Sequence, residues 1–536
     1  MDMWSWICEL PNSDEWAESD SPLVFQLAIE EDAKHNTQKS ILLKAERTSG
    51  SNTETLVTFS VCLEGFYYPS HNPHKTLWVS DPCPLSADKP FLPLLLQLLQ
   101  DIIARAPFTY DNTCPRSQLQ KLKPEPVSWI LDSHSPESFS TFFNLIFLCR
   151  LFWLCISDAP AEAGYLYMES LLGPNLSVLS TSKHVLRTFL TSIGVDGELC
   201  FMRTLGYMLA KWLILKGAAV VGKSQSLTKN NLRLGFSYAT ESHGFWSLKG
   251  YAPVLSMTRI GGSDHDQSPQ YPVLEAKDFV LTYALAHQQL EALIQLEYTA
   301  EFHEGFIQVT ARVDNLRFHV SKLGFGTNDN GDYDEERHFP SKIRVWVGPE
   351  IGATYVAGLS LGRSTDNPER EVETQKVVKG NFGKSKSSSL PRLKATARTS
   401  TRKTMKNWRW EQDAEGNAAV FEAVLYDNTS GDEVVTWKPG MVGGDLKTKN
   451  GSFRKRYSGA SRAFNKTGNV VFARDQHGEE VVWRLSKDME GSVLKWRIGG
   501  KVWLSYWPCN VQSSHIETRC VDWCDEVDLP LIPPGK

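Results

Sequence analysis

Alternation of apolar and polar residues through the C-terminal half places the strongest constraint on this fold. Ile294, Leu296 and Tyr298 alternate with polar residues such as Gln295, and the pattern resumes after a turn at 304–305. Successive strand residues point to opposite faces, so this pattern predicts a long hairpin with one buried face and one solvated face. Two more hairpins are predicted, one turning at Gly499 and Gly500 and one turning around Gly478. Repeated hairpins without intervening helices favour an antiparallel β-sandwich or open barrel over a parallel sheet.

The N-terminal part shows other patterns. Thr55–Glu64 alternates as a strand, and Phe91–Ala106 reads as an amphipathic helix that Pro107 ends. Residues 135–216 have helical spacing. The predicted fold class is therefore an α+β multidomain protein. It comprises an α+β region over 1–115, a helical region over 116–230 and a β-rich, sandwich-like domain over 231–525.

The segment 139–156 is apolar on nearly every side, with Arg150 near its middle. Ser135 and Pro136 precede it as a helix N-cap and a first helical residue. A buried charge is costly in a bilayer, so we expect a core helix and no transmembrane segment. A membrane-associated helix is the open alternative.

Charge and cysteine content bear on compartment and partners. The 536 residues carry a formal net charge of −5, which excludes a globally basic nucleic-acid-binding protein. The acidic N-terminus does not resemble a signal peptide. We therefore expect a cytoplasmic or nuclear protein whose ten cysteines are thiols.

One segment departs from this acidic balance. Residues 374–410 contain eleven Lys or Arg and no acidic residue. We expect a long exposed loop or a disordered insert at about 374–407. It could bind RNA or acidic lipid, with tryptophans that stack on bases, or it could be a solvated insert. The candidate anion-binding residues are Arg398, Arg402, Lys403, Lys406, Trp408, Arg409 and Trp410.

A string matching the phosphate-binding loop G-x-x-x-x-G-K-[ST] lies at 217–224. The candidate residues are Gly217, Gly222, Lys223 and Ser224. In that motif, backbone N–H groups hold phosphates and Lys reaches the terminal phosphates. Such a loop follows a strand, whereas this string follows a predicted helix that ends with Gly217 as its C-cap. Nucleotide binding therefore stays a minor alternative.

Cys509, His515, Cys520 and Cys524 form a thiol–imidazole group near the end of the sequence. Zinc prefers four such ligands in a tetrahedron. Structural zinc sites usually contain a C-x-x-C pair, and here the closest pair is C-x-x-x-C. Separate thiols are the simpler interpretation.

Tyr68, Pro69 and Pro73 fit the element Y-P-x-x-x-P, which lies between a predicted strand and a following strand and helix. Residues 21–110 resemble RWD domains in this order. The resemblance implies a protein-interaction module. Too few residues precede Leu23 for the first helix of that family.

The later half resembles a family of land-plant proteins, through the strings R-V-W-V-G-P-E-I-G from Arg344 and V-W-L-S-Y-W-P from Val502. This resemblance implies a family without implying an activity. No two catalytic groups occur in a motif whose context also fits. We therefore expect a non-catalytic interaction or scaffolding protein without a cofactor, whose protein partners and oligomeric state the sequence does not specify. A nucleotide-binding enzyme and an anion-binding protein are the alternatives.

Overall fold

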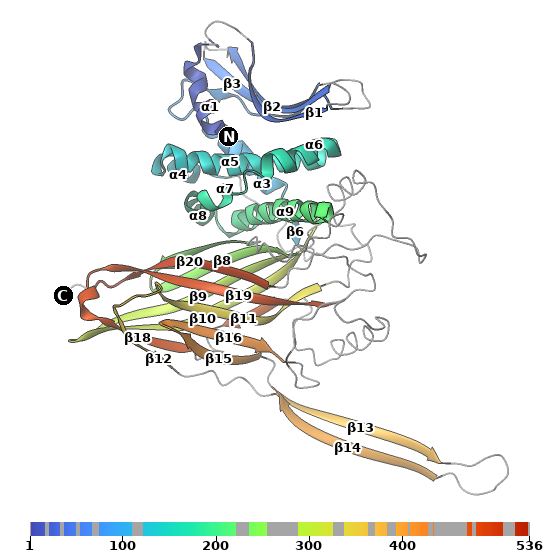
Figure 1. Cartoon of the computed structure of the whole chain (residues 1–536), viewed down its shortest axis with the longest axis vertical. Coiled ribbons are helices and arrows are strands. Elements are labelled where there is room, and N and C mark those ends of the chain that lie inside the picture. The colour runs from blue at the N-terminus through green and yellow to red at the C-terminus, as the bar shows by residue number, and fades with distance from the viewer. Residues whose placement is uncertain are drawn as a thin grey trace, which may run out of the picture.

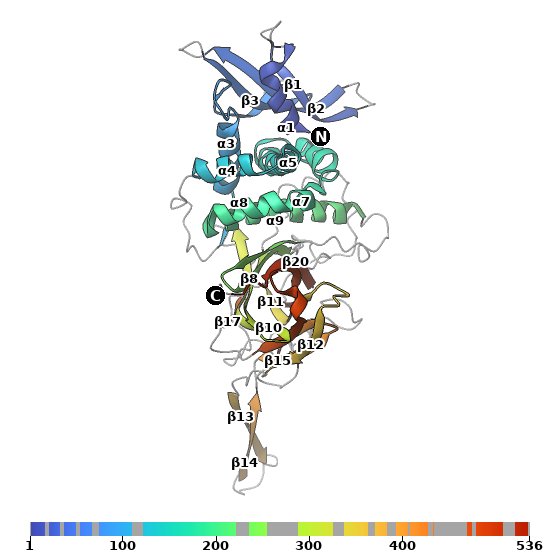
Figure 2. The same ribbon diagram turned by 90° about the vertical axis from the view of Figure 1, so that its left-hand side faces the viewer.

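The computed structural model stacks three parts along one axis (Figures 1 and 2). An N-terminal sheet lies at one end, a layer of helices lies in the middle, and two larger β-sheets follow. Helices and antiparallel sheets both contribute, as the α+β class requires. The structure describes residues 2–14, 16, 21–32, 37–49, 54–66, 74–109, 122–220, 235–254, 288–324, 337–362, 370–382, 393–405, 408–426, 433, 469–473, 479–507 and 520–533.

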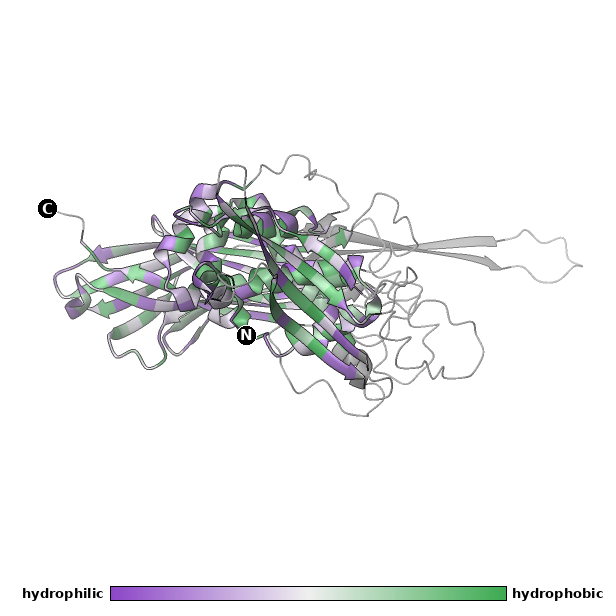
Figure 3. Cartoon of the chain, turned by 90° about the horizontal axis from the view of Figure 1, so that it is seen from above, coloured by the Kyte–Doolittle hydropathy of each residue, from purple (hydrophilic) through white to green (hydrophobic). Residues whose placement is uncertain are grey.

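The N-terminal sheet is antiparallel, with strand order β1-β2-β3-β4 and β5 paired with β3. Leu43 pairs with Val61 and Ile41 with Leu63, and all four side chains are buried. Hydrophobic and hydrophilic residues alternate along these strands (Figure 3), so one face packs on the helices. The strands are β1 (Leu23–Asp32), β2 (Thr37–Ser49), β3 (Thr55–Glu64), β4 (His74–Val79) and β5 (Cys83–Pro84), and β3 has the predicted bounds.

A short helix, α1 (Met3–Glu9), precedes this sheet. It has only seven residues, and the prediction that too few residues precede Leu23 for the first helix of RWD domains stays a prediction. Asp2 caps α1 by accepting a hydrogen bond from the Ser5 N–H at 3.0 Å, and it accepts another from the Ser140 hydroxyl of α5 (Pro136–Trp153) at 2.7 Å. Met3 is fully buried. Cap and tertiary contacts together stabilise a helix too short to form alone.

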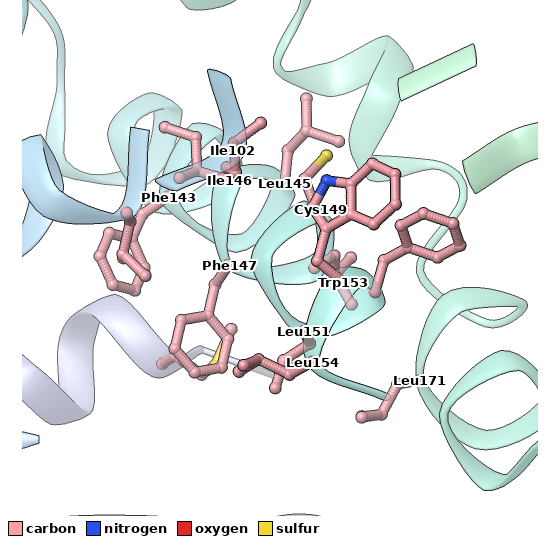
Figure 4. Close-up of a cluster of buried hydrophobic side chains, with 14 of the residues drawn as sticks. Ile102, Phe143, Leu145, Ile146, Phe147, Cys149, Leu151, Trp153, Leu154 and Leu171 are labelled. Carbon is pink, nitrogen blue, oxygen red and sulfur yellow. The ribbon is translucent and has the colours of Figure 1, made fainter. Parts of the chain in front are cut away.

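Helices form the middle layer, and α5 is its centre. Phe143, Ile146, Phe147 and Leu151 of α5 pack with Ile102 and other apolar side chains (Figure 4). The elements are η1 (Leu10–Asn12), α3 (Leu92–Ala104), α4 (Pro124–Ser133), α5 (Pro136–Trp153), η3 (Leu154–Asp158), α6 (Ala161–Leu166), η4 (Tyr167–Leu172), α7 (Val178–Thr181), α8 (Lys183–Ser192) and α9 (Val195–Val220).

The apolar segment around Arg150 is a buried helix. Among the described residues, Pro136–Asp158 is the one helix long and apolar enough to cross a membrane, and 83% of its apolar window is buried inside the protein. The Arg150 guanidinium lies 3.1 Å from the Asp101 carboxylate of α3, which also accepts a hydrogen bond from the Trp78 indole at 3.1 Å. Burial lowers the pKa of Arg150, and the Asp101 charge opposes that shift. A paired charge at this position suits a protein core.

The C-terminal part contains two antiparallel sheets that share one hydrophobic core. The first has the order β12-β18-β10-β9-β8-β7, with β17 and β6 also paired to β10, and the second has the order β15-β16-β11-β19-β20. Trp496 of the second sheet contacts Trp246 and Trp483 of the first, with ring centroids 5.3 and 4.8 Å apart. The predicted hairpin of β9 and β10 is confirmed, with Ala300 opposite Val309.

These strands have the following bounds. The first sheet contains β6 (Phe108–Thr109), β7 (Phe236–Ser242), β8 (Phe245–Val254), β9 (Gln288–Phe302), β10 (Phe306–Gly324), β12 (Val356–Leu361), β17 (Asn469–Ala473) and β18 (Glu480–Ser486). The second contains β11 (Arg337–Pro349), β15 (Trp408–Glu415), β16 (Ala418–Leu425), β19 (Val493–Trp507) and β20 (Cys520–Pro530). The short helix η8 (Lys487–Met489) follows β18.

Two predicted hairpins are wrong. The chain does not turn at Gly499 and Gly500, because β19 runs straight through both and pairs with β11 and β20. A Cβ atom at Gly499 would lie 2.1 Å from the Trp346 ring, so glycine there makes room for packing. In the other case, β17 and β18 do not pair with each other, since each pairs with a different part of β10.

The basic segment was predicted to be a loop or a disordered insert, and this is wrong for most of it. Strands β13 (Arg370–Phe382) and β14 (Leu393–Met405) form a two-stranded antiparallel ribbon. The ribbon projects away from the two sheets (Figures 1 and 2). Strand β13 contains three Val and β14 contains four Thr, and both residue types favour extended backbone despite the charge.

Two hydrophobic clusters fill the interior of the described residues. One hydrophobic cluster runs from Met3 through the N-terminal sheet and the helices to Phe236, Tyr238 and Tyr251. A second cluster fills the space between the two C-terminal sheets. The N-terminal sheet and the helical layer therefore pack against each other through one shared cluster.

Candidate functional site

The phosphate-loop string does not begin after a strand. Gly217 and the next three residues belong to α9, which runs to Val220, so Gly217 is not the predicted C-cap. Gly222, Lys223 and Ser224 lie outside the described residues. A phosphate-binding loop joins a strand to a following helix, whereas the described start of this string lies at the end of a helix.

The predicted zinc ligands do not come together where the structure describes them. Cys520 and Cys524 both lie on β20, opposite Trp503 and Gly499. Four strand residues span about 13 Å, whereas two thiolates on one zinc ion each lie about 2.3 Å from it. A shared zinc ion is therefore wrong for this pair. Cys509 and His515 lie outside the described residues, and among the residues described no group of three or more His, Cys, Asp or Glu could hold a metal ion.

The two tryptophans predicted to stack on bases pack inside the protein. Trp410 is buried, and its ring lies edge-on to Phe472 at 4.9 Å; Trp408 contacts the same ring at 5.4 Å. Both lie on β15, beyond the ribbon. Arg409 between them pairs with Glu411 at 2.9 Å. These three residues therefore belong to the second C-terminal sheet.

The remaining predicted residues fall on the ribbon or beyond the described part of the chain. Arg398, Arg402 and Lys403 lie on β14. Lys406 lies outside the described residues, as do Tyr68, Pro69 and Pro73 of the interaction motif.

The ribbon concentrates positive charge. Residues 370–405 contain ten Lys or Arg against Glu371 and Glu373, a net charge of +8. The rest of the chain contains forty-seven Lys or Arg against sixty Asp or Glu, a net charge of −13. Within the described residues, β13 and β14 pair only with each other. A basic arm of this kind attracts anionic partners while the acidic remainder does not.

The two faces of the ribbon differ in composition. Phe382 pairs with Leu393 and Val378 with Ala397. Residues two positions apart share a face, so these pairs belong to one face. The other face carries most of the basic positions of β14, namely Lys394, Arg398 and Arg402, together with Lys379 of β13.

A buried carboxylate joins the helical layer to the first C-terminal sheet. Glu198, in the first turn of α9, is 1% exposed. It accepts hydrogen bonds from the hydroxyls of Tyr238 at 2.5 Å and Tyr251 at 2.6 Å, and from the Lys249 ammonium at 2.6 Å. Burial raises the pKa of both tyrosines, and the Glu198 charge raises it further. Both phenols therefore stay protonated and act as donors.

Two further ion pairs join the helical layer to the C-terminal sheets, one to each sheet. Arg203 of α9 makes two hydrogen bonds to Glu291 of β9, at 2.8 and 3.3 Å. Lys183 of α8 pairs with Asp525 of β20 at 2.5 Å. At Gly206 of α9, a Cβ atom would lie 2.5 Å from a Gln289 side-chain oxygen. We call these three ion pairs and this close approach the interlayer clamp.

Sequence reasoning missed the interlayer clamp. Glu198 is forty residues from Tyr238 and fifty-three from Tyr251. No local spacing links them. The acidic first turn of α9 was a visible signal, but it reads equally as an ordinary helix start.

Comparison with known proteins gives no family. No family model matches the chain, and no curated protein matches it. Among solved structures, the Clostridium perfringens NetB toxin in its membrane-inserted form aligns with a TM-score of 0.18 and 8% identity, over 55% of this chain and 94% of that chain. Clostridium perfringens delta-toxin gives 0.21 and 11% over 55% and 96%, and a structure described as a pore forming protein gives 0.19 and 10% over 55% and 100%. Scores this low do not establish a common fold.

Proposed function

We propose that this is a non-catalytic interaction protein that binds an anionic surface through the ribbon β13–β14. The observation that carries the proposal is the separation of charge. Residues 370–405, which include both strands of the projecting ribbon, carry a net charge of +8, whereas the other residues of the chain sum to −13. Juxtamembrane or surface-bound Lys and Arg contribute about 1 kcal/mol each toward an anionic surface at low salt.

The interlayer clamp supports the scaffolding part of this proposal. Glu198, Arg203 and Lys183 all have partners on the β-sheets. These three charged side chains join the helical layer to the C-terminal sheets, which suits a rigid scaffold that presents binding elements.

Finer features of the fold belong to the same proposal. We infer that the N-terminal sheet with α3 is RWD-like, since β3 and β4 precede α3 in the order that family uses. We infer too that the two C-terminal sheets form a sandwich, supported by their shared core. A cytoplasmic or nuclear location fits the free thiols, such as fully buried Cys149 and Cys155.

The test is sedimentation with vesicles of phosphatidylcholine alone or with phosphatidylserine, with single-stranded RNA measured in parallel. Replacing Lys394, Arg398 and Arg402 by Gln removes three charges from one face of the ribbon. We expect binding to weaken by about ten- to a hundredfold, and to weaken in wild type as salt rises.

The control is Arg409→Gln, which removes one nearby basic residue that is already paired with Glu411. Binding by this variant should equal that of wild type. Equal binding by the triple variant and by wild type, or no binding of wild type to any anionic probe, contradicts the proposal.

A further inference from the structure

We propose that the anionic surface is a lipid bilayer, and that one face of the ribbon enters its interface at the end where Phe382 pairs with Leu393. This inference rests on the proposed function, because charge brings the ribbon to the surface. It adds a second, apolar contribution to binding that comes from one face only.

The strand register gives the first argument. On one face, the three rows nearest that end are Phe382 with Leu393, Gly380 with Ala395, and Val378 with Ala397. All six residues are apolar. The next row on this face, Lys376 with Thr399, is polar. Because each row is set by backbone pairing, these six residues occupy consecutive positions on one face, and we call these positions the apolar patch.

The opposite face has a different composition over the same rows. It contains Asn381 with Lys394, Lys379 with Thr396, and Val377 with Arg398. Three of these six residues are basic. Long basic side chains can reach lipid phosphates while apolar neighbours enter the acyl region.

The length of the apolar patch fits a segment that lies in the bilayer interface better than a strand that crosses the bilayer. Five strand residues extend about 15 Å, and strands that cross a bilayer need about 9–11 residues. Interfacial segments bury an apolar face about 5–10 Å deep. The apolar patch therefore matches one leaflet.

Composition favours lipid over RNA. Proteins that bind single-stranded RNA stack bases on several aromatic rings. Phe382 is the one aromatic residue of β13 and β14, and Trp408 and Trp410 pack on Phe472. A bilayer uses the apolar patch, whereas an RNA backbone would leave it exposed.

Val377 and Val378 offer a matched test, since they are neighbours of identical chemistry on opposite faces. The experiment compares Val378→Ser with Val377→Ser in the full chain, using vesicles that contain phosphatidylserine. We expect Val378→Ser to weaken partitioning by roughly fivefold to tenfold, and Val377→Ser to leave it unchanged. Thermal unfolding of both variants verifies that the body remains folded.

A second variant removes a larger apolar side chain from the same face and should weaken partitioning further. Phe382→Ser should weaken partitioning by at least tenfold, and the loss should persist at high salt, where charge is screened. Equal effects of the two valine variants overturn the inference while leaving the proposed function intact. Tight binding to RNA with none to vesicles also overturns it, and a lack of any anion binding removes both proposals.

Discussion

The Glu198 carboxylate lies 2.6 Å from the Lys249 ammonium, and this contact joins the first turn of α9 to β8. Glu198 is buried, whereas the Lys249 side chain is 32% exposed. Two tyrosine hydroxyls complete the coordination of the carboxylate. The Glu198 side chain therefore accepts hydrogen bonds from three residues of β7 and β8.

Neutralising this carboxylate should loosen the interlayer clamp. We expect Glu198→Gln to lower the free energy of unfolding by about 1–3 kcal/mol, because hydrogen bonds to a charged group become bonds to a neutral amide. Lys249 is partly exposed, so water compensates for some of its lost charge partner. Urea denaturation measures the change. Glu301→Gln is the control, since that side chain is 60% exposed, and an equal loss in both variants would contradict a role for the clamp.

The Arg150–Asp101 pair should respond unequally to removal of its two members. Asp101→Asn leaves a buried guanidinium without its charge partner, and we expect a loss of about 3 kcal/mol. Arg150→Met removes the buried charge and keeps its volume, while Asp101 stays partly exposed and bonded to Trp78. The expected loss is about 1 kcal/mol or less. Guanidinium denaturation tests the order, and a larger loss for Arg150→Met would refute this account.

Two glycines of α9 should give opposite results when changed to alanine. Alanine favours a helix over glycine by about 1 kcal/mol. At Gly206 the added Cβ would lie 2.5 Å from the Gln289 side-chain oxygen, and Gln289 is only 1% exposed and has little room to move, so we expect a net destabilisation of about 1–2 kcal/mol. At Gly197 the nearest atom is the flexible end of Ile193 at 3.2 Å, so we expect no loss or a small gain. Melting temperatures distinguish the two, and a stabilised Gly206→Ala would show that α9 does not approach β9 so closely.

Stability should fall in mild acid because of His338. Burial lowers the pKa of this imidazole from 6.5 to about 3. The folded protein keeps His338 neutral over that interval, whereas the unfolded chain takes up a proton below about pH 6.5. Unfolding therefore binds a proton, and stability declines as pH falls from 6.5 towards 3.

The His338 contribution is measured by difference. We compare the free energy of unfolding of wild type and His338→Gln at several pH values. The wild-type curve should fall more steeply, by up to roughly 1.4 kcal/mol per pH unit. Parallel curves would rule out this imidazole as the titrating group.

Local patterns predicted the elements whose stability is local. β3 has the predicted bounds, Ser135 caps α5 by accepting a hydrogen bond from the Ser138 N–H, and the β9–β10 hairpin has the expected alternation. In each case the residues that determine the element are neighbours in the sequence or are joined by one short turn.

Features that depend on distant partners were not predicted. Gly499 and Gly500 read as a turn, yet they lie in β19 where Trp346 and Ile294 need space. The many basic residues of β14 obscured the alternation of apolar and polar residues that indicates a strand. Helix α1 depends on a contact with Ser140 of another helix. The interlayer clamp brings Glu198 to tyrosines that no motif connects to it.

The unbroken hydrophobic cluster from Met3 to Tyr251 has a mechanical consequence. The N-terminal sheet and the ribbon lie at opposite ends of the long axis (Figures 1 and 2). A molecule captured by the first would therefore be kept apart from whatever the second adheres to by the helical layer and the two C-terminal sheets.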